Sequence, residues 1–319
     1  MDRRVILNIL FGGNGERGAV CLNALLGKGY KIVCVLVHPL TKEEEDPGSV
    51  TKVAEKMGLP VLHPVNVNDP NIIADLLQFA PDLIVLAGYR QIVKQAFIDL
   101  SEFGCINLHG GVLPQYRGSS PMNWALIKGD REFGISITQV DTGVDTGNVL
   151  DERIFPISNE DTIVDLHRTA NRAFPEMLLG VLAQIENGTS QGRIQDEAQA
   201  SYWPLRFPAD GLILWDMYTA DQIHNRIRAL TEPYPCAFTF FKGQRVKLLA
   251  SRLNDVPHYG DPGRIYAKRR GGILVCASDR CLWIQRALIG EAQEDLSHFV
   301  ERYDKFATMC DLVVEMLPT

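Results

Sequence analysis

Five short apolar segments in the first 150 residues constrain the fold more than any other feature of the chain. These segments lie at residues 5–11, 32–37, 83–87, 105–108 and 135–140. The helical segments between them lie at residues 16–27, 49–57, 71–79 and 121–128. Strands that are apolar throughout, with helices between them, are typical of a mostly parallel sheet covered on both faces. The sequence therefore predicts a doubly wound α/β fold.

A long amphipathic helix is predicted at 161–185, and Pro175 inside it is expected to kink or split it. The pattern of predicted elements changes after about residue 205. A second helix is predicted at 219–230, and short strands with glycine turns follow, which favours a small open barrel. Because 319 residues exceed what one ordinary core holds, we expect two domains, residues 1–200 with the parallel sheet and residues 206–319 with the barrel.

Composition and charge narrow the classes of partner. No apolar run approaches the ~18 residues of a membrane span, and the apolar segment near the start is too short for a signal peptide. The formal net charge of -7 lowers the expectation of a large polyanionic partner. The seven cysteines are scattered without CxxC spacing, which indicates reduced thiols rather than disulfides or zinc. We therefore expect a cytoplasmic protein without a membrane, nucleic-acid or metal partner.

The segment INLHGGVLPQYRG, residues 106–118, contains the strongest candidate for a functional site. Asn107 and His109 are two residues apart on a predicted strand, so their side chains point to the same face. A glycine-rich loop follows them, and ligands of open α/β sheets bind outside the carboxyl ends of the strands. An amide beside an imidazole at this place favours a functional site over a structural histidine.

A second polar segment, QVDTGVDTG at residues 139–147, connects two predicted regions of strand. Its acids, threonines and glycines suit an ordinary turn. They also suit a binding loop that brings a carboxylate to His109, and the segment alone does not decide between the two.

Together the two segments resemble the Asn-His-Asp signature of the folate-dependent formyltransferases. The resemblance covers nearly the whole chain, since a small C-terminal barrel is typical of two branches of that family. It implies a Rossmann-like catalytic domain, an OB-like barrel and a homodimer formed through the barrel. It also implies N10-formyltetrahydrofolate as co-substrate, no metal, and Asn107, His109 and Asp145 as the catalytic residues.

The chemistry of formyl transfer to a primary amine suits these three side chains. Asn107 can donate a hydrogen bond to the oxyanion that develops on the formyl group. His109 can stabilise the same oxyanion or move the proton that the amine loses. Asp145 can hold the imidazole tautomer or accept the proton through a water. Which residue takes the proton first stays open.

The resemblance also places the folate between two loops, one after the predicted strand at 83–87 and one at 140–145. The pterin is typically held there by backbone groups. The residues assigned to it are Gly88, Tyr89, Arg90, Ile92, Val140, Asp141 and Gly143.

A glycine motif after the first predicted strand offers a competing interpretation. Residues 13–18 match GxGxxG, which suggests a nucleotide-dependent oxidoreductase. A dinucleotide site also needs an acid at the end of the next strand, but the sequence there is His38-Pro39 and the next acid is Glu43. We instead expect this helix N-terminus to lie near a diphosphate of the acceptor substrate, with contacts from Gly13, Asn14 and Arg17.

Two branches of the family compete for the acceptor. The branch that formylates methionyl-tRNA usually carries a basic insertion after the second strand, whereas residues 38–47 here hold four acids that would repel phosphates. Residues 116–124, 201–204 and 231–238 resemble the amino-sugar branch. The expected acceptor is therefore a nucleoside-diphosphate amino sugar, used for surface polysaccharide, with methionyl-tRNA as the alternative.

A non-catalytic binding module on the same fold is a further alternative, and the intact Asn107, His109 and Asp145 argue against it. Besides the glycine motif, five residues are expected to contact the acceptor: Gly110, Tyr116, Arg117, Tyr202 and Trp203.

Overall fold

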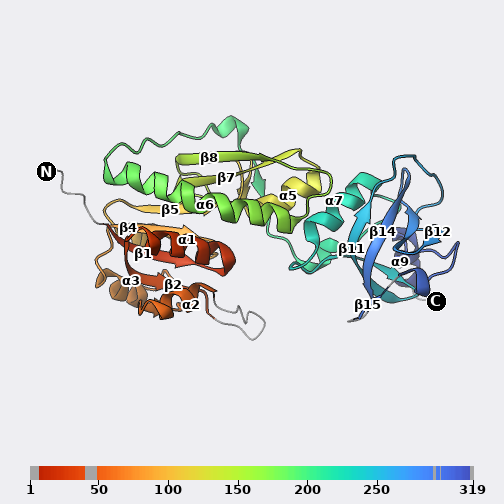
Figure 1. Ribbon diagram of the computed structural model, residues 1–319, viewed down its shortest axis with the longest axis horizontal. Helices are drawn as coiled ribbons and strands as arrows, with labels where there is room; N and C mark the ends of the chain where they lie inside the picture. Colours follow the sequence, from red (N-terminus) through yellow and green to blue (C-terminus); the bar gives the residue numbers. More distant parts are fainter. Residues whose placement is uncertain (1–6, 40–48, 290–291, 295, 317–319) are drawn as a thin grey trace. The chain divides into compact units, whose positions relative to one another are not determined.

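The predicted parallel sheet is present in the computed structural model, which describes residues 7–39, 49–289, 292–294 and 296–316. Its strand order is β3-β2-β1-β4-β5-β7-β8 (Figure 1). The strands are β1 (Asn8–Gly13), β2 (Lys31–Leu36), β3 (Val61–Leu62), β4 (Leu83–Ala87), β5 (Cys105–His109), β7 (Glu132–Gln139) and β8 (Val149–Pro156). Strands β1 to β5 pair in parallel, and β7 runs antiparallel to β5. The mostly parallel α/β fold is confirmed.

The order of the strands creates a switch point between β1 and β4. From β1 the chain continues to β2 and β3 on one side, then returns to β4 and β5 on the other. Gly13 at the end of β1 is in register with Ala87 at the end of β4, and the Asn14 N–H donates to the Ala87 carbonyl at 3.2 Å. Ligands of doubly wound sheets bind at such a crevice.

Helices follow the strands because apolar residues recur at helical spacing and meet the sheet. Helix α1 buries Ala19, Cys21, Leu22 and Leu25 and contacts β1 and β4. Helix α3 begins where the Asp69 side chain accepts the Asn71 N–H at 2.9 Å, with Pro70 in its first turn. The helices of this part are α1 (Gly15–Gly27), α2 (Ser49–Lys56), α3 (Pro70–Leu77), α4 (Gln95–Ile98), α5 (Pro121–Lys128) and α6 (Ile163–Glu186).

Helix α6 passes through Pro175 without being split. The apolar side chains on both sides of the proline, Phe174, Met177 and Leu178, are all buried. Burial of this continuous stripe offsets the one backbone hydrogen bond that proline cannot make.

The C-terminal part forms an antiparallel sheet, as the short strands predict. Its order is β10-β11-β14-β13-β12, with β15 beside β14. The strands are β10 (Ala237–Phe241), β11 (Gln244–Arg252), β12 (Ile265–Arg269), β13 (Gly272–Cys276), β14 (Cys281–Ile289) and β15 (Ala292–Glu294). The helices are α7 (Ala220–Leu230), α8 (Leu296–Phe299) and α9 (Met309–Met316). Helix α7 begins at a capping box of Thr219 and Gln222.

The described residues also form four short elements. The two-residue strand β6 (Arg117–Gly118) pairs in parallel with β9 (Tyr202–Trp203), which follows the short 3-10 turn η1 (Glu197–Gln199); a second turn, η2, spans Pro208–Gly211. Backbone contacts divide the chain into two compact units, and residues 122–132 and 156–166 belong to the unit that contains 204–319. The domain limits 1–200 and 206–319 stay a prediction.

The core of the second unit centres on Trp215. This side chain is fully buried, its indole N–H donates to the Thr239 hydroxyl at 2.8 Å, and its ring stacks on Phe306 with centroids 5.4 Å apart. Cys276 and Cys281 lie opposite each other on β13 and β14 with their sulfur atoms in contact, and the expectation of reduced thiols stays a prediction. Among the helices of the described residues, none is long and apolar enough to cross a membrane.

Replacing Trp215 by alanine should destabilise this unit strongly. Loss of the buried ring and exposure of the Thr239 hydroxyl to an empty space should lower the free energy of unfolding by about 3–5 kcal/mol. Urea denaturation followed by circular dichroism measures this loss. A Trp283→Ala variant is the control, because Trp283 on β14 is only half-buried; a larger loss for the control than for Trp215→Ala would contradict the assignment of the core.

Candidate active site

Strand β5 brings the predicted amide and imidazole to one face. Asn107 lies opposite Thr138 of β7, and His109 lies opposite Ser136. His109 is 6% exposed. The Asn107 side chain is half-buried, and among the described residues its amide has no hydrogen-bond partner. The amide is therefore available to a ligand beside the imidazole.

Both ring nitrogens of His109 face oxygen atoms. Nε2 lies 2.6 Å from the Tyr116 carbonyl oxygen, and Nδ1 lies 3.6 Å from Asp145 Oδ1. A carbonyl only accepts, so Nε2 carries a proton in this arrangement. A neutral imidazole has one N–H, so the carboxylate beside Nδ1 is placed to stabilise the ring when it takes up a second proton. This geometry suits a residue that receives a proton during a reaction.

Asp145 reaches His109 from the loop between β7 and β8. Its backbone has a φ of 53°, in the left-handed region that only a few side chains tolerate. Its Oδ2 accepts the Gly118 N–H at 2.8 Å, and its carbonyl oxygen accepts the Gln195 side-chain N–H at 2.8 Å. Hydrogen bonds therefore hold both the carboxylate and the backbone carbonyl of Asp145.

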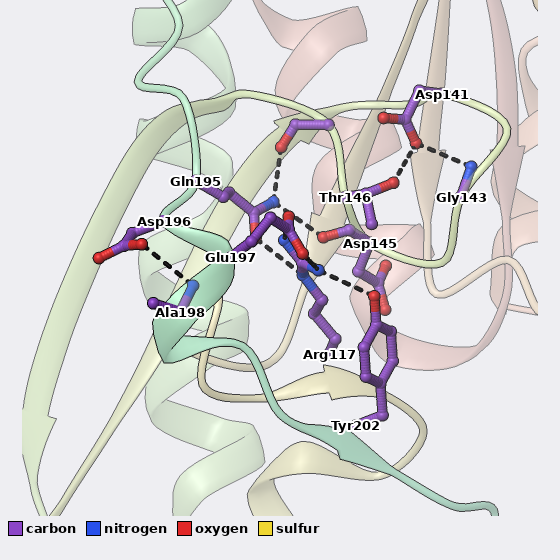
Figure 2. Close-up of polar contacts among 11 residues, drawn as sticks. Arg117, Asp141, Gly143, Asp145, Thr146, Gln195, Asp196, Glu197, Ala198 and Tyr202 are labelled. Atoms are coloured by element: carbon purple, nitrogen blue, oxygen red, sulfur yellow. Dashed lines mark hydrogen bonds and ion pairs between the residues drawn. The ribbon is translucent and has the colours of Figure 1, made fainter.

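The same loop is stabilised from within. Asp141 Oδ1 accepts the Gly143 N–H at 3.0 Å and the Thr146 hydroxyl at 2.5 Å (Figure 2). A Cβ on Gly143 would lie 2.0 Å from the Thr146 hydroxyl oxygen, so no other residue fits without moving this loop. Asp141 and Gly143 therefore shape the loop through their own hydrogen bonds.

The residues predicted to hold the folate lie on two loops that share one apolar core. Tyr89 and Val140 pack against the same cluster of buried residues, which includes Leu86, Val93 and Phe97. The Tyr89 ring stacks on His38 with centroids 4.7 Å apart. Burial raises the pKa of the Tyr89 phenol, and its hydroxyl has no hydrogen-bond partner among the described residues.

The remaining residues of the first loop have distinct positions. Gly88 has a φ of 73° and would bring a Cβ to 3.2 Å from the Asn14 carbonyl oxygen. The Arg90 N–H donates to His38 Nε2 at 2.8 Å. Ile92 is 75% exposed. This loop and the glycine motif after β1 thus lie side by side at the switch point.

Within the glycine motif, Gly13 ends β1, Asn14 precedes α1, and Arg17 turns towards α6. A guanidinium nitrogen of Arg17 lies 3.3 Å from His167 Nδ1, and the guanidinium carbon lies 5.0 Å from the centre of the Phe174 ring. The Arg17 guanidinium therefore packs against α6, and its predicted contact with a diphosphate stays a prediction.

Of the residues expected to contact the acceptor, four gather around β6 and β9. Tyr116 stacks on Trp203 with centroids 5.5 Å apart. Arg117 Nη1 donates to the Tyr202 hydroxyl at 2.8 Å. Arg117 is fully buried and donates its other hydrogen bonds to Gln195 and Glu197, so in this arrangement its guanidinium does not reach an acceptor. Gly110 directly follows His109.

The sequence did not predict a group of polar residues on β7, on β8 and in the segment after α6. The Ser136 hydroxyl donates to the Gly111 carbonyl at 2.8 Å and lies 3.0 Å from Glu152 Oε2, while Arg193 pairs with Glu152 Oε1 at 3.1 Å. The run Gln195-Asp196-Glu197 was also missed. A polar run just before β9 was the available signal, but nothing in the sequence connected it with residues 117 or 145. Among the described residues, no group of three His, Cys, Asp or Glu side chains is arranged to hold a metal ion.

His167 gives a pH-dependent stability. Burial and the neighbouring Arg17 guanidinium lower the pKa of His167 to about 4. The unfolded chain, with an ordinary histidine, binds more protons between about pH 6.5 and pH 4, so the folded state should lose up to about 3 kcal/mol of stability as the pH falls through that window.

The measurement is urea denaturation of the native chain and His167→Gln at pH 7 and pH 4.5. The variant should lose less stability on acidification, since glutamine does not titrate. Burial also lowers the pKa of His224, but both proteins keep that residue. Equal losses in the two proteins would show that His167 does not contribute.

Comparisons with known proteins identify the family of the chain. A family model described as formyl transferase matches residues 6–182, and one described as formyl transferase, C-terminal domain, matches residues 207–303. The methionyl-tRNA formyltransferase of Desulfotalea psychrophila is 34% identical over 284 residues, which cover 88% of this chain and 87% of that protein. The methionyl-tRNA formyltransferase of Citrifermentans bemidjiense is 33% identical over 302 residues, with 93% and 94% covered.

A solved structure shows the same fold at lower identity. The N-formyltransferase from Helicobacter canadensis in complex with folinic acid and dTDP-3-aminofucose superposes with a TM-score of 0.68 at 19% identity, covering 88% of this chain and 99% of that one.

The expected acceptor, a nucleotide-linked amino sugar, was wrong. The relatives that match most of this chain at 33–34% identity are named methionyl-tRNA formyltransferases, whereas the amino-sugar enzyme, at 19%, shares only the fold. The expectation depended on the acidic segment 38–47, most of which lies outside the described residues. With two family models that match most of its length and relatives above 30% identity, the chain belongs to the formyltransferase family.

Proposed function

We propose that this protein transfers a formyl group from N10-formyltetrahydrofolate to the amine of methionyl-tRNA. The proposed reaction type is supported by one observation, the positions of Asn107, His109 and Asp145 at the end of β5. The choice of acceptor is supported by relatives of the same name that match both parts of the chain at 33–34% identity.

In this proposal the three side chains divide the chemistry of one acyl transfer. The amine nitrogen forms a bond to the formyl carbon, the bond from that carbon to the carrier nitrogen breaks, and the amine loses a proton. Asn107 donates a hydrogen bond to the oxygen that becomes negative. His109 takes the amine proton and Asp145 beside Nδ1 stabilises the charged ring, after which the proton passes to the nitrogen of the departing carrier. The carrier supplies an activated formyl group.

In this proposal the folate lies between the loops that follow β4 and β7, and each loop exposes an apolar side chain. Ile92 on one loop is 75% exposed, and Val144 on the other is 48% exposed. Apolar side chains that are exposed on loops around a reactive site are covered when a ligand binds. The buried Tyr89 hydroxyl, which lacks a partner within the described residues, adds a hydrogen-bonding group at the base of the first loop. The residues Gly88, Tyr89, Arg90, Ile92, Val140, Asp141 and Gly143 stay the proposed folate contacts.

The C-terminal residues 204–319, which form one part of the second unit, support a nucleic-acid acceptor although the chain as a whole is acidic. Residues 204–319 hold 15 basic and 14 acidic residues, while the whole chain has a net charge of -7. Arg245 and Lys247 lie on the same face of β11, and the Arg245 guanidinium carbon lies 3.6 Å from the centre of the Phe238 ring. Arg245 is exposed and Lys247 is half-buried. Cations on a protein surface bind phosphates, and binding of this kind weakens with salt.

A formyl-transfer assay tests the acceptor. With N10-formyltetrahydrofolate as donor, methionyl-tRNA should be formylated, and its KM should rise steeply between 50 and 200 mM salt as expected for phosphate contacts, by about tenfold or more. Uncharged tRNA and a panel of nucleotide-linked 3-amino and 4-amino sugars serve as parallel acceptors. Formylation of an amino sugar without formylation of methionyl-tRNA would contradict the proposed acceptor but not the proposed reaction type.

Replacing His109 by alanine tests the site itself. Loss of the group that takes the proton should lower kcat by about 10²–10⁴-fold, while the dissociation constant for the formyl carrier, measured by calorimetry, should change little. His258→Ala is the matched control, because His258 is exposed and lies in the second unit. Near-normal turnover by His109→Ala would remove this residue from the mechanism.

A further inference from the structure

A buried cation lies one residue before the backbone N–H that holds Asp145. Arg117 is 0% exposed and donates through each of its three nitrogen atoms (Figure 2). Nε donates to Gln195 Oε1 at 3.0 Å, Nη1 donates to Glu197 Oε2 at 2.9 Å, and Nη2 donates to Glu197 Oε1 at 2.5 Å. This fork geometry is specific to arginine and fixes the plane of the guanidinium.

The counter-ion of the buried Arg117 is Glu197, a residue at the surface. Glu197 is 70% exposed, and the hydrogen bonds from Arg117 hold the pKa of Glu197 below its usual value. The same bonds raise the pKa of Arg117. A buried cation that loses its partner is costly, so Glu197 keeps Arg117 in this orientation.

Arg117 in turn fixes the orientation of the Gln195 amide. An arginine donates and never accepts, so the oxygen of Gln195 must face Nε, and the amide nitrogen must face the other way. That nitrogen donates to the Asp145 carbonyl at 2.8 Å and to the Gly147 carbonyl at 2.6 Å. Gln195 is 6% exposed, so water does not substitute readily for these bonds.

The two contacts converge on a strained residue. Asp145 has a positive φ, which costs free energy unless the surroundings hold it. Gln195 holds its carbonyl oxygen, and the N–H of Gly118, the neighbour of Arg117 on β6, holds its carboxylate. A Cβ on Gly118 would lie 2.4 Å from the Trp203 carbonyl oxygen, so β6 lies close against β9.

We propose that Arg117, Gln195 and Glu197 form a positioning network that holds the Asp145 carboxylate beside His109. None of the three contacts His109, so they act through Asp145. The proposal rests on the roles given to His109 and Asp145 but not on the acceptor. It differs from direct recognition of an acceptor by Arg117, which would require this buried guanidinium to leave Glu197.

The test compares Arg117→Lys and Gln195→Glu with the native chain. Lysine keeps the charge but loses the fork and the bond to Gln195. Glutamate keeps the shape and the acceptor for Arg117 but loses the donor to the two carbonyls. Arg153→Lys is the matched control, because Arg153 also makes a two-nitrogen contact with a glutamate, Glu176, at 3.2 and 3.1 Å in the same unit.

Two measurements separate positioning from general destabilisation. In the transfer assay, each network variant should lose about 10–100-fold in kcat with both KM values within about twofold, since misplacement of a reacting group by about 1 Å costs this much. Independently of activity, hydrogen exchange should become about tenfold faster in peptides covering residues 140–147, because buried hydrogen bonds to this loop are lost. Arg153→Lys should change neither.

Other outcomes would overturn the proposal. A raised acceptor KM with unchanged kcat would identify Arg117 as a recognition residue. Slower turnover without faster exchange in residues 140–147 would mean that the network does not act through Asp145. Since the exchange measurement needs no acceptor, a failure of the proposed acceptor leaves this test intact. If Arg117→Lys is insoluble, the isosteric Gln195→Glu decides the question by the same two measurements.

Discussion

The register of β5 between β4 and β7 places the Asn107 amide and the His109 imidazole on one face of the main sheet. The rest of the site depends on this register, because a shift of one residue would turn both side chains to the other face. Asn107 pairs with Leu86 of β4 and Thr138 of β7, so both neighbouring strands fix its position. The loop that follows β7 then brings Asp145 to His109.

Asp145, the acid of the site, is not positioned by the sheet as Asn107 and His109 are. Asp145 lies in a loop and has an unfavourable backbone conformation, so the sheet alone does not fix it. Its position depends on hydrogen bonds from Gly118 and Gln195, which reach the loop from other parts of the sequence. Buried polar networks of this kind impose one geometry when every member is satisfied. The imidazole of His109 is thus placed by the strand β5, and the carboxylate beside it is placed by hydrogen bonds to the loop between β7 and β8.

Charge is unevenly distributed along the chain. The acids that give the chain its net charge of -7 lie mainly in residues 1–203, whereas the remainder is nearly neutral. Two basic side chains, Arg245 and Lys247, lie on β11 within the second unit, and Arg245 contacts the Phe238 ring. A net charge for the whole chain is therefore a weak guide to nucleic-acid binding, since phosphates respond to local clusters of lysine and arginine.

Periodicity and two short motifs were enough to predict the parallel sheet, the antiparallel second part and the candidates Asn107, His109 and Asp145, because strands, turns and glycine loops leave local patterns. The sequence did not reveal that α6 continues through Pro175, since burial on both sides of a proline is a tertiary effect. It also did not reveal that Arg117 is buried against Glu197 rather than open to a ligand. Residues 117, 145 and 195 are far apart in the chain, and only folding brings their polar atoms within hydrogen-bonding distance.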